Sequence, residues 1–352
     1  MKATHSLIQR LPENTALDIV GDIHGEIDAL NNLLTHLGYD ENGNHPENRY
    51  LVFVGDFIDR GINSPAVISR IKTLVETKHA FAILGNHELN LLNSEEKDGS
   101  GWFFPHQRQK ELHRYISTTI VKNQNERDEI INFLNSLPVA LERSDLRVVH
   151  AAWLPQQINK IRQIRNLTAQ VAYENFKQQA RTEQKNETWY QAYLQEHHFY
   201  HEHSEDENFA MPFLDNICLH DLFHGQANPM RAITCGTEMP SQKPFFAAGR
   251  WRFITRCRWW NEYDDNIPVI IGHYWRQWRL HKDSNALLFP EASNHWLGKR
   301  KNVFCIDFSI GALWKTRLAH TQHNVHKPRL AAFRLPENIL IFDNGEKCCT
   351  IK

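Results

Sequence analysis

The stretch Gly21-Asp22-Ile23-His24-Gly25 begins a series of three polar clusters that decides the fold of this chain. The second cluster is Gly55-Asp56-Phe57-Ile58-Asp59-Arg60-Gly61, and the third is Gly85-Asn86-His87-Glu88. Each cluster directly follows an apolar run that predicts a buried strand, and successive clusters lie roughly 30 residues apart, the length of a βαβ unit. Because ligands of open α/β sheets bind at the carboxyl ends of strands, we expect the three clusters to meet in one crevice.

Strands and helices alternate in the first part of the chain. Strands are predicted at Ala16–Val20, Tyr50–Val54 and Ala80–Leu84. Leucines at helical spacing predict a helix that ends near Gly38, and Asn63 is a suitable N-cap for a second helix. This alternation predicts a parallel sheet.

Three later apolar runs also end in polar residues. They are Leu146–Val149 before His150, Pro268–Ile271 before Gly272-His273, and Val303–Ile306 before Asp307. We expect these strands to extend the core and to bring their histidines to the same crevice.

The three clusters together resemble the signature of the metallophosphoesterases, and within them the phosphoprotein phosphatase branch. That branch includes serine/threonine-type protein phosphatases and diadenosine tetraphosphatases of bacteria. The resemblance covers about 1–155 and 245–312 of this sequence. It implies the α/β calcineurin-like metallophosphoesterase fold, in which two packed mixed β-sheets are flanked by helices. Three ordered blocks are a much more specific signal than a single Asn-His-Glu.

The segment 156–245 differs in composition from the rest of the chain. It is rich in Gln, Asn, Glu and His, and its pattern predicts helix from Ile158 to His198 and loop after that. We therefore expect a catalytic core formed by 1–155 and 245–352, with 156–245 as an inserted cap. Variable segments around a fixed site commonly set substrate specificity.

The resemblance implies a centre of two divalent metal ions, Mn²⁺ or a combination of Fe and Zn²⁺. By analogy with the family, Asp22 and His24 hold the first ion and Asp56 bridges both. The second ion is then completed by Asn86, His150 and His273. In the family a hydroxide held by the metals attacks phosphorus, since coordination lowers the pKa of bound water to about 7.

The resemblance also assigns the acid–base and phosphate-binding groups. His87 is expected to be the general acid that protonates the leaving group, with Asp59 keeping its imidazole charged and oriented. Arg60 matches the arginine that clamps phosphate oxygens. Glu88 is expected to orient neighbouring groups, and Asp307 to support a ligand histidine.

A second phosphate-binding arginine is expected in the segment Arg250–Trp260. Period-two alternation predicts a strand that carries Arg250, Arg252, Arg256 and Arg258 on one face, with an apolar face opposite. Either Arg256 or Arg258 is expected to reach the phosphate. Other readings are a solvated strand face, or a basic and aromatic surface for nucleic acid.

Composition narrows the class of partners. The 352 residues carry 40 Lys and Arg against 41 Asp and Glu, for a formal charge of −1, so neither nucleic acid nor an anionic membrane is expected as a partner. No apolar run reaches the length of a membrane span, and the polar N-terminus does not resemble a signal peptide. The six cysteines fit no zinc pattern, which favours reduced thiols in a cytoplasmic protein.

Two histidine groups outside the clusters are discounted. His220 and His224 mimic a zinc-protease helix, but Asp221 stands where that motif has Glu. His197, His198, His201 and His203 are interpreted as a solvated His-rich segment.

The leading functional hypothesis is a metal-dependent phosphatase acting on phosphomonoesters of a protein or a small molecule. The alternative is a hydrolase of dinucleoside polyphosphates, for which surplus arginines and tryptophans would hold extra phosphates and stack a base; those tryptophans are Trp259, Trp260, Trp275 and Trp278. A phosphoprotein-binding module without activity is a third hypothesis, and a nuclease is a fourth.

Overall fold

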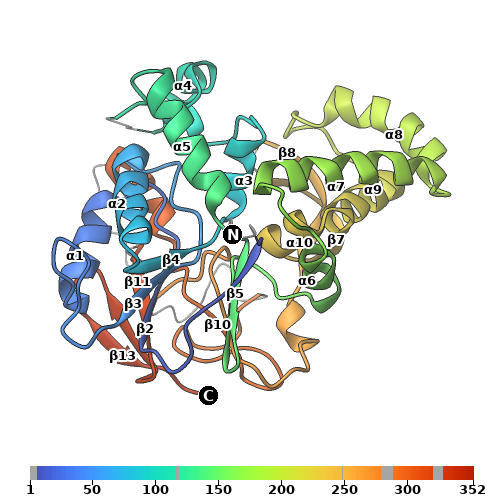
Figure 1. The fold of residues 1–352 in the computed structure, drawn as a ribbon. Coiled ribbons are helices and arrows are strands. Elements are labelled where there is room, and N and C mark those ends of the chain that lie inside the picture. Colours follow the sequence, from blue (N-terminus) through green and yellow to red (C-terminus); the bar gives the residue numbers. More distant parts are fainter. Residues whose placement is uncertain (1–5, 116–118, 248, 279–287, 320–327) are drawn as a thin grey trace.

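The computed structural model describes residues 6–115, 119–247, 249–278, 288–319 and 328–352. Two mixed β-sheets pack face to face and helices lie outside them (Figure 1). A two-stranded antiparallel sheet and a group of helices form a further layer beside the sheets.

The six-stranded sheet contains the three strands that precede the polar clusters. Its order is β13-β12-β11-β2-β3-β4, and its strands are β2 (Leu17–Val20), β3 (Tyr50–Phe53), β4 (Ala80–Ala82), β11 (Ala331–Leu335), β12 (Ile339–Phe342) and β13 (Lys347–Cys349). Strands β2, β3 and β4 pair in parallel, with Ile19 opposite Val52 and Phe53 opposite Ala82. The carboxyl ends of these strands therefore lie at one edge, as the sequence predicts.

The five-stranded sheet contains the strands that precede the late histidines. Its order is β1-β5-β6-β9-β10, and its strands are β1 (Ile8–Arg10), β5 (Ala140–Arg143), β6 (Leu146–Val149), β9 (Val269–Ile271) and β10 (Val303–Cys305). Strand β9 pairs in parallel with both β6 and β10, so these three strands also end at one edge.

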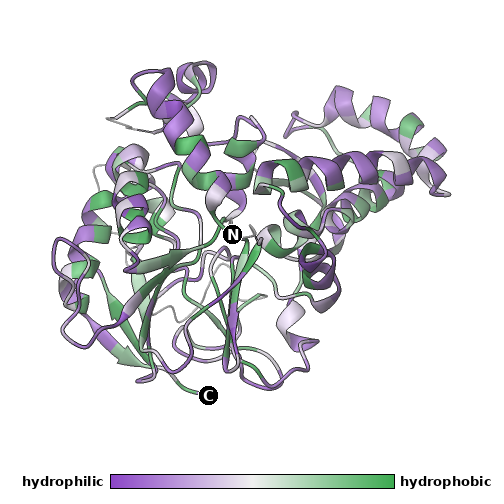
Figure 2. Cartoon of the chain, viewed as in Figure 1, coloured by the Kyte–Doolittle hydropathy of each residue, from purple (hydrophilic) through white to green (hydrophobic). Residues whose placement is uncertain are grey.

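The core between the sheets explains the continuous apolar runs. Ile19 and Val52 point into a cluster that also contains Val148, Ile270 and Phe304 from the other sheet. Their sequence neighbours point the other way, into a second cluster beneath the outer helices. A strand that is buried on both faces is apolar at nearly every position, and the buried Asp18 is the exception in β2. Much of the six-stranded sheet is accordingly coloured as hydrophobic in Figure 2.

Helices α1 (Ile27–Leu37) and α2 (Ser64–Glu76) cover the outer face of the six-stranded sheet. Helix α1 ends at Gly38, whose φ of 96° is in the left-handed region that glycine adopts without strain. Helix α2 begins at Asn63, whose side chain accepts a hydrogen bond from the N–H of Ala66. Both boundaries confirm the sequence prediction.

The next part of the chain forms short helices. They are α3 (Asn86–Leu92), a 3-10 helix at Ser100–Trp102, α4 (Pro105–Glu111) and α5 (Gln124–Ser136), and near the C-terminus a 3-10 helix at Ile310–Ala312 is followed by α11 (Leu313–Ala319). Helix α3 begins with two of the predicted site residues, Asn86 and His87.

The segment predicted as an insertion is helical in both halves, so the expected loop after His198 is wrong. Its elements are α6 (Pro155–Arg162), α7 (Ala169–Glu183), a 3-10 helix at Gln184–Asn186, α8 (Tyr190–His203), α9 (Asp215–Ala227) and α10 (Pro229–Cys235). Apolar residues of α9 are spread around the helix, so its sequence lacks the periodicity of a surface helix. Ile217 and Cys218 pack against the two-stranded sheet, while Leu219 is exposed. The division into a core and a cap remains a prediction.

The predicted arginine strand is shorter than expected. It pairs as β8 (Arg250–Arg256) with β7 (Glu238–Ala247), and Phe253 packs on the predicted apolar face. The strand ends at Arg256, and Arg258 lies beyond it, at the start of a 3-10 helix, Trp259–Asn261. The prediction of four arginines on one strand face is therefore wrong, because the strand ends at Arg256 and the chain turns before Arg258.

Candidate metal centre

Both sheets deliver side chains to one buried place. From the six-stranded sheet come the residues after β2, β3 and β4, and from the five-stranded sheet come those after β6 and β9. The residues predicted as metal ligands are all buried or largely buried: Asp22, His24, Asp56, Asn86, His150 and His273. Packing the two sheets face to face brings together residues that are far apart in the chain.

Asp56 is at the centre of this arrangement. Its Oδ2 atom lies 3.7 Å from Nε2 of His24, 3.9 Å from Nε2 of His87 and 3.4 Å from Nε2 of His150. Two sets of three ligand atoms are each close enough to hold one ion: one set comes from His24, Asp56 and His87, the other from Asp56, His150 and His273. Asp56 belongs to both sets, which is the position of a bridging carboxylate.

Asn86 joins the second set through its amide oxygen. This atom lies 2.9 Å from Nδ1 of His273 and 3.3 Å from Nε2 of His150. An amide oxygen and two imidazole nitrogens suit a divalent transition metal.

Asp22 is fixed by the opposite sheet. The backbone N–H of His273 donates to both of its carboxylate oxygens, over 3.0 and 3.2 Å. The preceding residue is Gly272, and a Cβ atom there would lie 2.0 Å from Oδ1 of Asp22. Glycine is therefore required for this close approach of the two strand ends.

Two of the histidines have a defined tautomer. Nδ1 of His24 donates to the carbonyl of Ile58 over 3.0 Å, and Nδ1 of His150 donates to the carbonyl of Val54 over 2.8 Å. Since a carbonyl oxygen only accepts, each Nδ1 must carry the proton. When the ring is neutral, Nε2 then presents its lone pair towards Asp56.

The electrostatics of the site indicate that cations belong in it. Burial and the neighbouring Asp307 raise the pKa of Asp22 well above its usual range. Burial opposes ionisation of Asp56 too, but His150 and His87 outweigh it and the pKa of Asp56 is low. Burial also lowers the pKa of His150, but Asp56 outweighs this effect and the pKa is raised to about 10. Divalent ions would stabilise these buried carboxylates, so the donor set fits a metal centre.

Left-handed backbone conformations are concentrated at this site. The φ angle is positive at His24 (48°), Asp56 (50°), Asp59 (73°), Arg60 (67°) and His273 (71°). Such conformations cost about 1–3 kcal/mol each for non-glycine residues and persist only where the surroundings impose them.

Glu88 holds the loop that carries Asp56. Its carboxylate accepts hydrogen bonds from the backbone N–H groups of Asp56 (2.9 Å), Phe57 (2.8 Å) and Gly85 (2.8 Å). Glu88 is fully buried. This confirms the prediction that it orients its neighbours.

His87 and Asp59 form a hydrogen-bonded pair next to the ligand sets. Nδ1 of His87 lies 2.5 Å from Oδ2 of Asp59. The other oxygen of Asp59 accepts from the indole N–H of Trp102 over 2.7 Å, and the Asp59 N–H donates to Oγ of Ser64 over 2.9 Å. Sequence reasoning missed Trp102 and Ser64, since both lie outside the three clusters.

Arg60 lies between the site and an indole ring. Its Nη1 atom donates to Nε2 of His24 over 3.1 Å, and its guanidinium carbon lies 4.8 Å from the ring centroid of Trp275. The N–H of Trp275 donates to Asp307 over 2.6 Å. Asp307 also accepts from the backbone N–H of Ser309, so its carboxylate holds backbone groups on both sides of it in the fold. The predicted support of a ligand histidine by Asp307 stays a prediction.

The structure places Arg256 near the site. Its guanidinium carbon lies 5.4 Å from the ring centroid of Tyr274, the residue after His273. Burial first and then the charge of Arg256 lower the pKa of His273. Of the tryptophans considered for base stacking, Trp259 and Trp260 are buried in the core and Trp278 packs on Phe342. Trp275 is partly exposed beside Arg60.

The histidines of α8 and α9 form aromatic contacts. The ring of His220 stacks on Tyr193 at 4.0 Å between centroids, and Nε2 of His224 donates to Gln184 over 2.7 Å. Among the described residues, the two sets that share Asp56 are the His, Cys, Asp and Glu groups close enough to hold a metal.

The family model of the calcineurin-like phosphoesterases matches residues 16–219. The match covers most of the chain and includes the three clusters and His150, so the chain belongs to this family of metallophosphoesterases. Its sheets and site have the calcineurin-like fold that the sequence predicts.

Two bacterial bis(5'-nucleosyl)-tetraphosphatases are similar to part of this chain. The chain is 34% identical over 146 residues to the asymmetrical bis(5'-nucleosyl)-tetraphosphatase PrpE of Oceanobacillus iheyensis, which is 40% of this chain and 58% of that protein. It is also 34% identical over 139 residues to the symmetrical bis(5'-nucleosyl)-tetraphosphatase of a Janthinobacterium species, 39% of this chain and 43% of that protein. The chain thus spans only part of the length of these relatives.

Among solved structures, a protein serine/threonine phosphatase from Saccharomyces cerevisiae is 14% identical, with a TM-score of 0.47. That likeness covers 99% of this chain and 85% of the phosphatase.

In the part of the chain that the structure describes, no helix combines the length and the apolar character needed to cross a membrane.

Proposed function

We propose that this protein is a dinuclear-metal-dependent phosphohydrolase. The observation that carries the proposal is the shared position of Asp56 in two sets of buried ligand atoms. Asp22, His24 and Asp56 would hold one ion, and Asp56, Asn86, His150 and His273 the other. His87 also lies near the first set, but its Nδ1 is hydrogen-bonded to Asp59, which favours the role of an acid over that of a ligand.

The bound ions would supply Lewis-acid charge and lower the pKa of a coordinated water. The rest of the chemistry comes from side chains of the chain. Asp59 accepts a hydrogen bond from Nδ1–H of His87, which orients Nε2 towards the centre, where a leaving oxygen would receive the Nε2 proton. Arg60 would bind phosphate oxygens with its planar guanidinium, and Arg256 would add a second positive charge.

Two substrate classes fit this machinery. A phosphomonoester, on a protein or a small molecule, needs only the centre, His87 and one arginine. A dinucleoside polyphosphate would also use the charge of Arg256 and the exposed face of Trp275. The names of the curated relatives support the second class, and we rank the two equally.

Phosphate release by metal-stripped protein tests the proposal. Mn²⁺, Zn²⁺, Fe²⁺ or Mg²⁺ is restored, and p-nitrophenyl phosphate, phosphopeptides and diadenosine tetraphosphate are offered in parallel. Metal-dependent release that falls by about 10²–10⁴-fold in His87→Ala, with metal content unchanged, is expected. The substrate that is cleaved decides between the two classes. Two bound metals with no turnover of any substrate would contradict the proposal and favour a binding module.

A further inference from the structure

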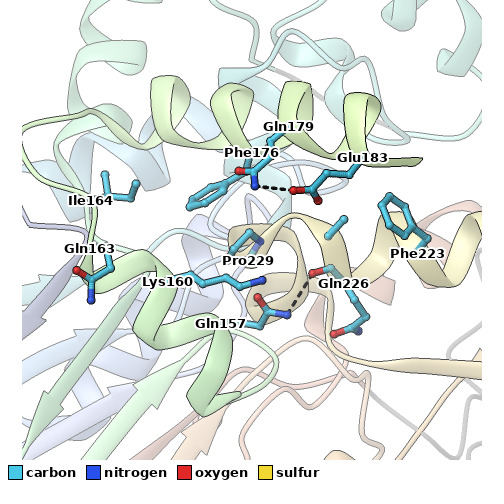
Figure 3. Close-up of a pocket in the computed structure, with 11 residues that line it drawn as sticks. Gln157, Lys160, Gln163, Ile164, Phe176, Gln179, Glu183, Phe223, Gln226 and Pro229 are labelled. Atoms are coloured by element: carbon cyan, nitrogen blue, oxygen red, sulfur yellow. Dashed lines mark hydrogen bonds between the residues drawn. The ribbon is translucent and has the colours of Figure 1, made fainter. Parts of the chain in front are cut away.

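A cavity lies outside the metal centre, among the helices of the 156–245 segment. It has a volume of about 600 Å³ and is formed by residues of α6, α7, α9 and α10 (Figure 3). Its apolar part comes from Ile164, Phe176, Phe223, Ala227 and Pro229. The volume falls within the range of sites that hold small organic ligands, about 300–1,000 Å³.

One polar atom of the lining is buried without a partner. Gln157 donates from Nε2 to the carbonyl of Gln226 over 3.1 Å, which fixes the orientation of the amide. Its Oε1 is buried and accepts no hydrogen bond from the residues that the structure describes. A buried acceptor without a donor is costly, so the position favours a ligand that brings an N–H or O–H group.

The lining of the cavity also contains two charged residues, Lys160 and Glu183. Lys160 is its cation and forms no ion pair within the described part of the chain, so it is available to an anionic group. Glu183 is its carboxylate, and Oε1 of Glu183 already accepts from Gln179 over 2.7 Å (Figure 3).

We propose that this cavity binds a mononucleotide whose base carries an exocyclic amino group. The base would lie against the phenyl rings and donate its amino group to Oε1 of Gln157, while Lys160 pairs with the phosphate. The site is independent of the reaction proposed above, because none of its lining residues belongs to the metal centre.

Helix α10 links the cavity to the metal centre. Pro229, at its first turn, lines the cavity. Near its other end, the carbonyl of Ile233 accepts hydrogen bonds from the N–H groups of Ala151 and Ala152, the two residues after His150. The cavity is therefore one short helix away from a predicted metal ligand.

Titration calorimetry with two nucleotides tests the proposal. AMP carries the amino group and IMP carries a carbonyl oxygen in its place, so AMP should bind about tenfold more tightly. The preference should disappear in Gln157→Ala and remain in Gln178→Ala, a matched change at an exposed position of the same bundle outside the cavity. Lys160→Ala should weaken the binding of AMP at least threefold and leave the binding of adenosine unchanged.

A separate variant locates the binding. AMP could also bind at the metal centre through its phosphate, so Arg60→Ala is titrated alongside and should keep the preference for AMP over IMP. Circular dichroism confirms that each variant is folded. The proposal is overturned if AMP does not bind at millimolar concentration, if Arg60→Ala abolishes binding, or if the preference for AMP survives in Gln157→Ala.

Discussion

The Nδ1 atom of His87 lies 2.5 Å from the Oδ2 atom of Asp59, and the second oxygen of Asp59 is held by the indole N–H of Trp102. Both residues of the pair are buried beside the ligand sets. The carboxylate can therefore fix the orientation of the imidazole without contacting substrate itself.

Asp59→Asn tests this role. The asparagine amide has one oxygen that can accept a hydrogen bond from Nδ1–H of His87, and it carries no negative charge. We therefore expect kcat to fall by about 10²-fold or more. Metal content, measured by atomic emission, should stay at the level of the unchanged protein. Asp128→Asn, at an exposed position of α5, is the control and should keep full activity. Loss of metal in Asp59→Asn would show that Asp59 maintains the centre and not the acid.

Trp275→Leu tests the contact between the indole ring and Arg60. Removing the ring face should free the guanidinium and weaken inhibition by inorganic phosphate about three- to tenfold, as expected for a cation–π contact of about 1 kcal/mol. Trp275→Phe keeps a ring and should restore part of the effect. If the leucine and phenylalanine variants behave alike and match the unchanged protein, the ring does not position Arg60.

Gly272→Ala tests the close approach between the strand ends. A Cβ atom there would lie 2.0 Å from Oδ1 of Asp22, so the carboxylate must move and metal affinity should fall at least tenfold. Gly225→Ala is the control, because its nearest neighbour would be Oε2 of Glu238 at 3.7 Å. Equal metal affinity in both variants would contradict the assignment of Asp22.

Glu88→Gln tests the anchor of the Asp56 loop. Three backbone N–H groups donate to the two carboxylate oxygens of Glu88. A glutamine has one acceptor oxygen, so at least one of these N–H groups would lose its partner. We expect the free energy of unfolding to fall by about 1–3 kcal/mol, measured by urea denaturation of the metal-free protein. An unchanged midpoint would mean that the loop does not depend on this carboxylate.

His224 predicts a pH dependence of stability away from the metal centre. Burial and then the neighbouring His220 lower the pKa of His224 to about 4. In the unfolded state the pKa of His224 is near 6.5, so on acidification the unfolded chain takes up the proton before the folded protein does. The stability that the neutral His224 contributes is therefore present above pH 6.5 and is lost as the pH falls towards 4. His224→Gln should reduce the loss of unfolding free energy between pH 7 and 5 by about 1–2 kcal/mol, given partial exposure. His201→Gln, at an exposed position of α8, should leave it unchanged.

Local patterns decided much of this protein. The strands β2, β3 and β4, the cap at Asn63 and the end of α1 at Gly38 follow from periodicity and from backbone preferences of single residues. Short motifs were enough to name the metal-ligand candidates, because parallel strands place their carboxyl ends at one edge. The arginine segment and α9 could not be read in this way, because a turn after Arg256 and burial on several sides of a helix leave no periodic trace.

By itself the sequence determined the kind of chemistry, since residue types at strand ends specify ligands for metal and phosphate wherever the strands meet. Only the tertiary structure decided how distant parts of the chain meet. It brings His273 against Asp22, Trp102 against Asp59 and Trp275 against Arg60. These contacts form across two sheets and their connecting loops, and no local preference encodes them. They arise because the two sheets bury their faces in one shared core, which holds the strand ends of both sheets together.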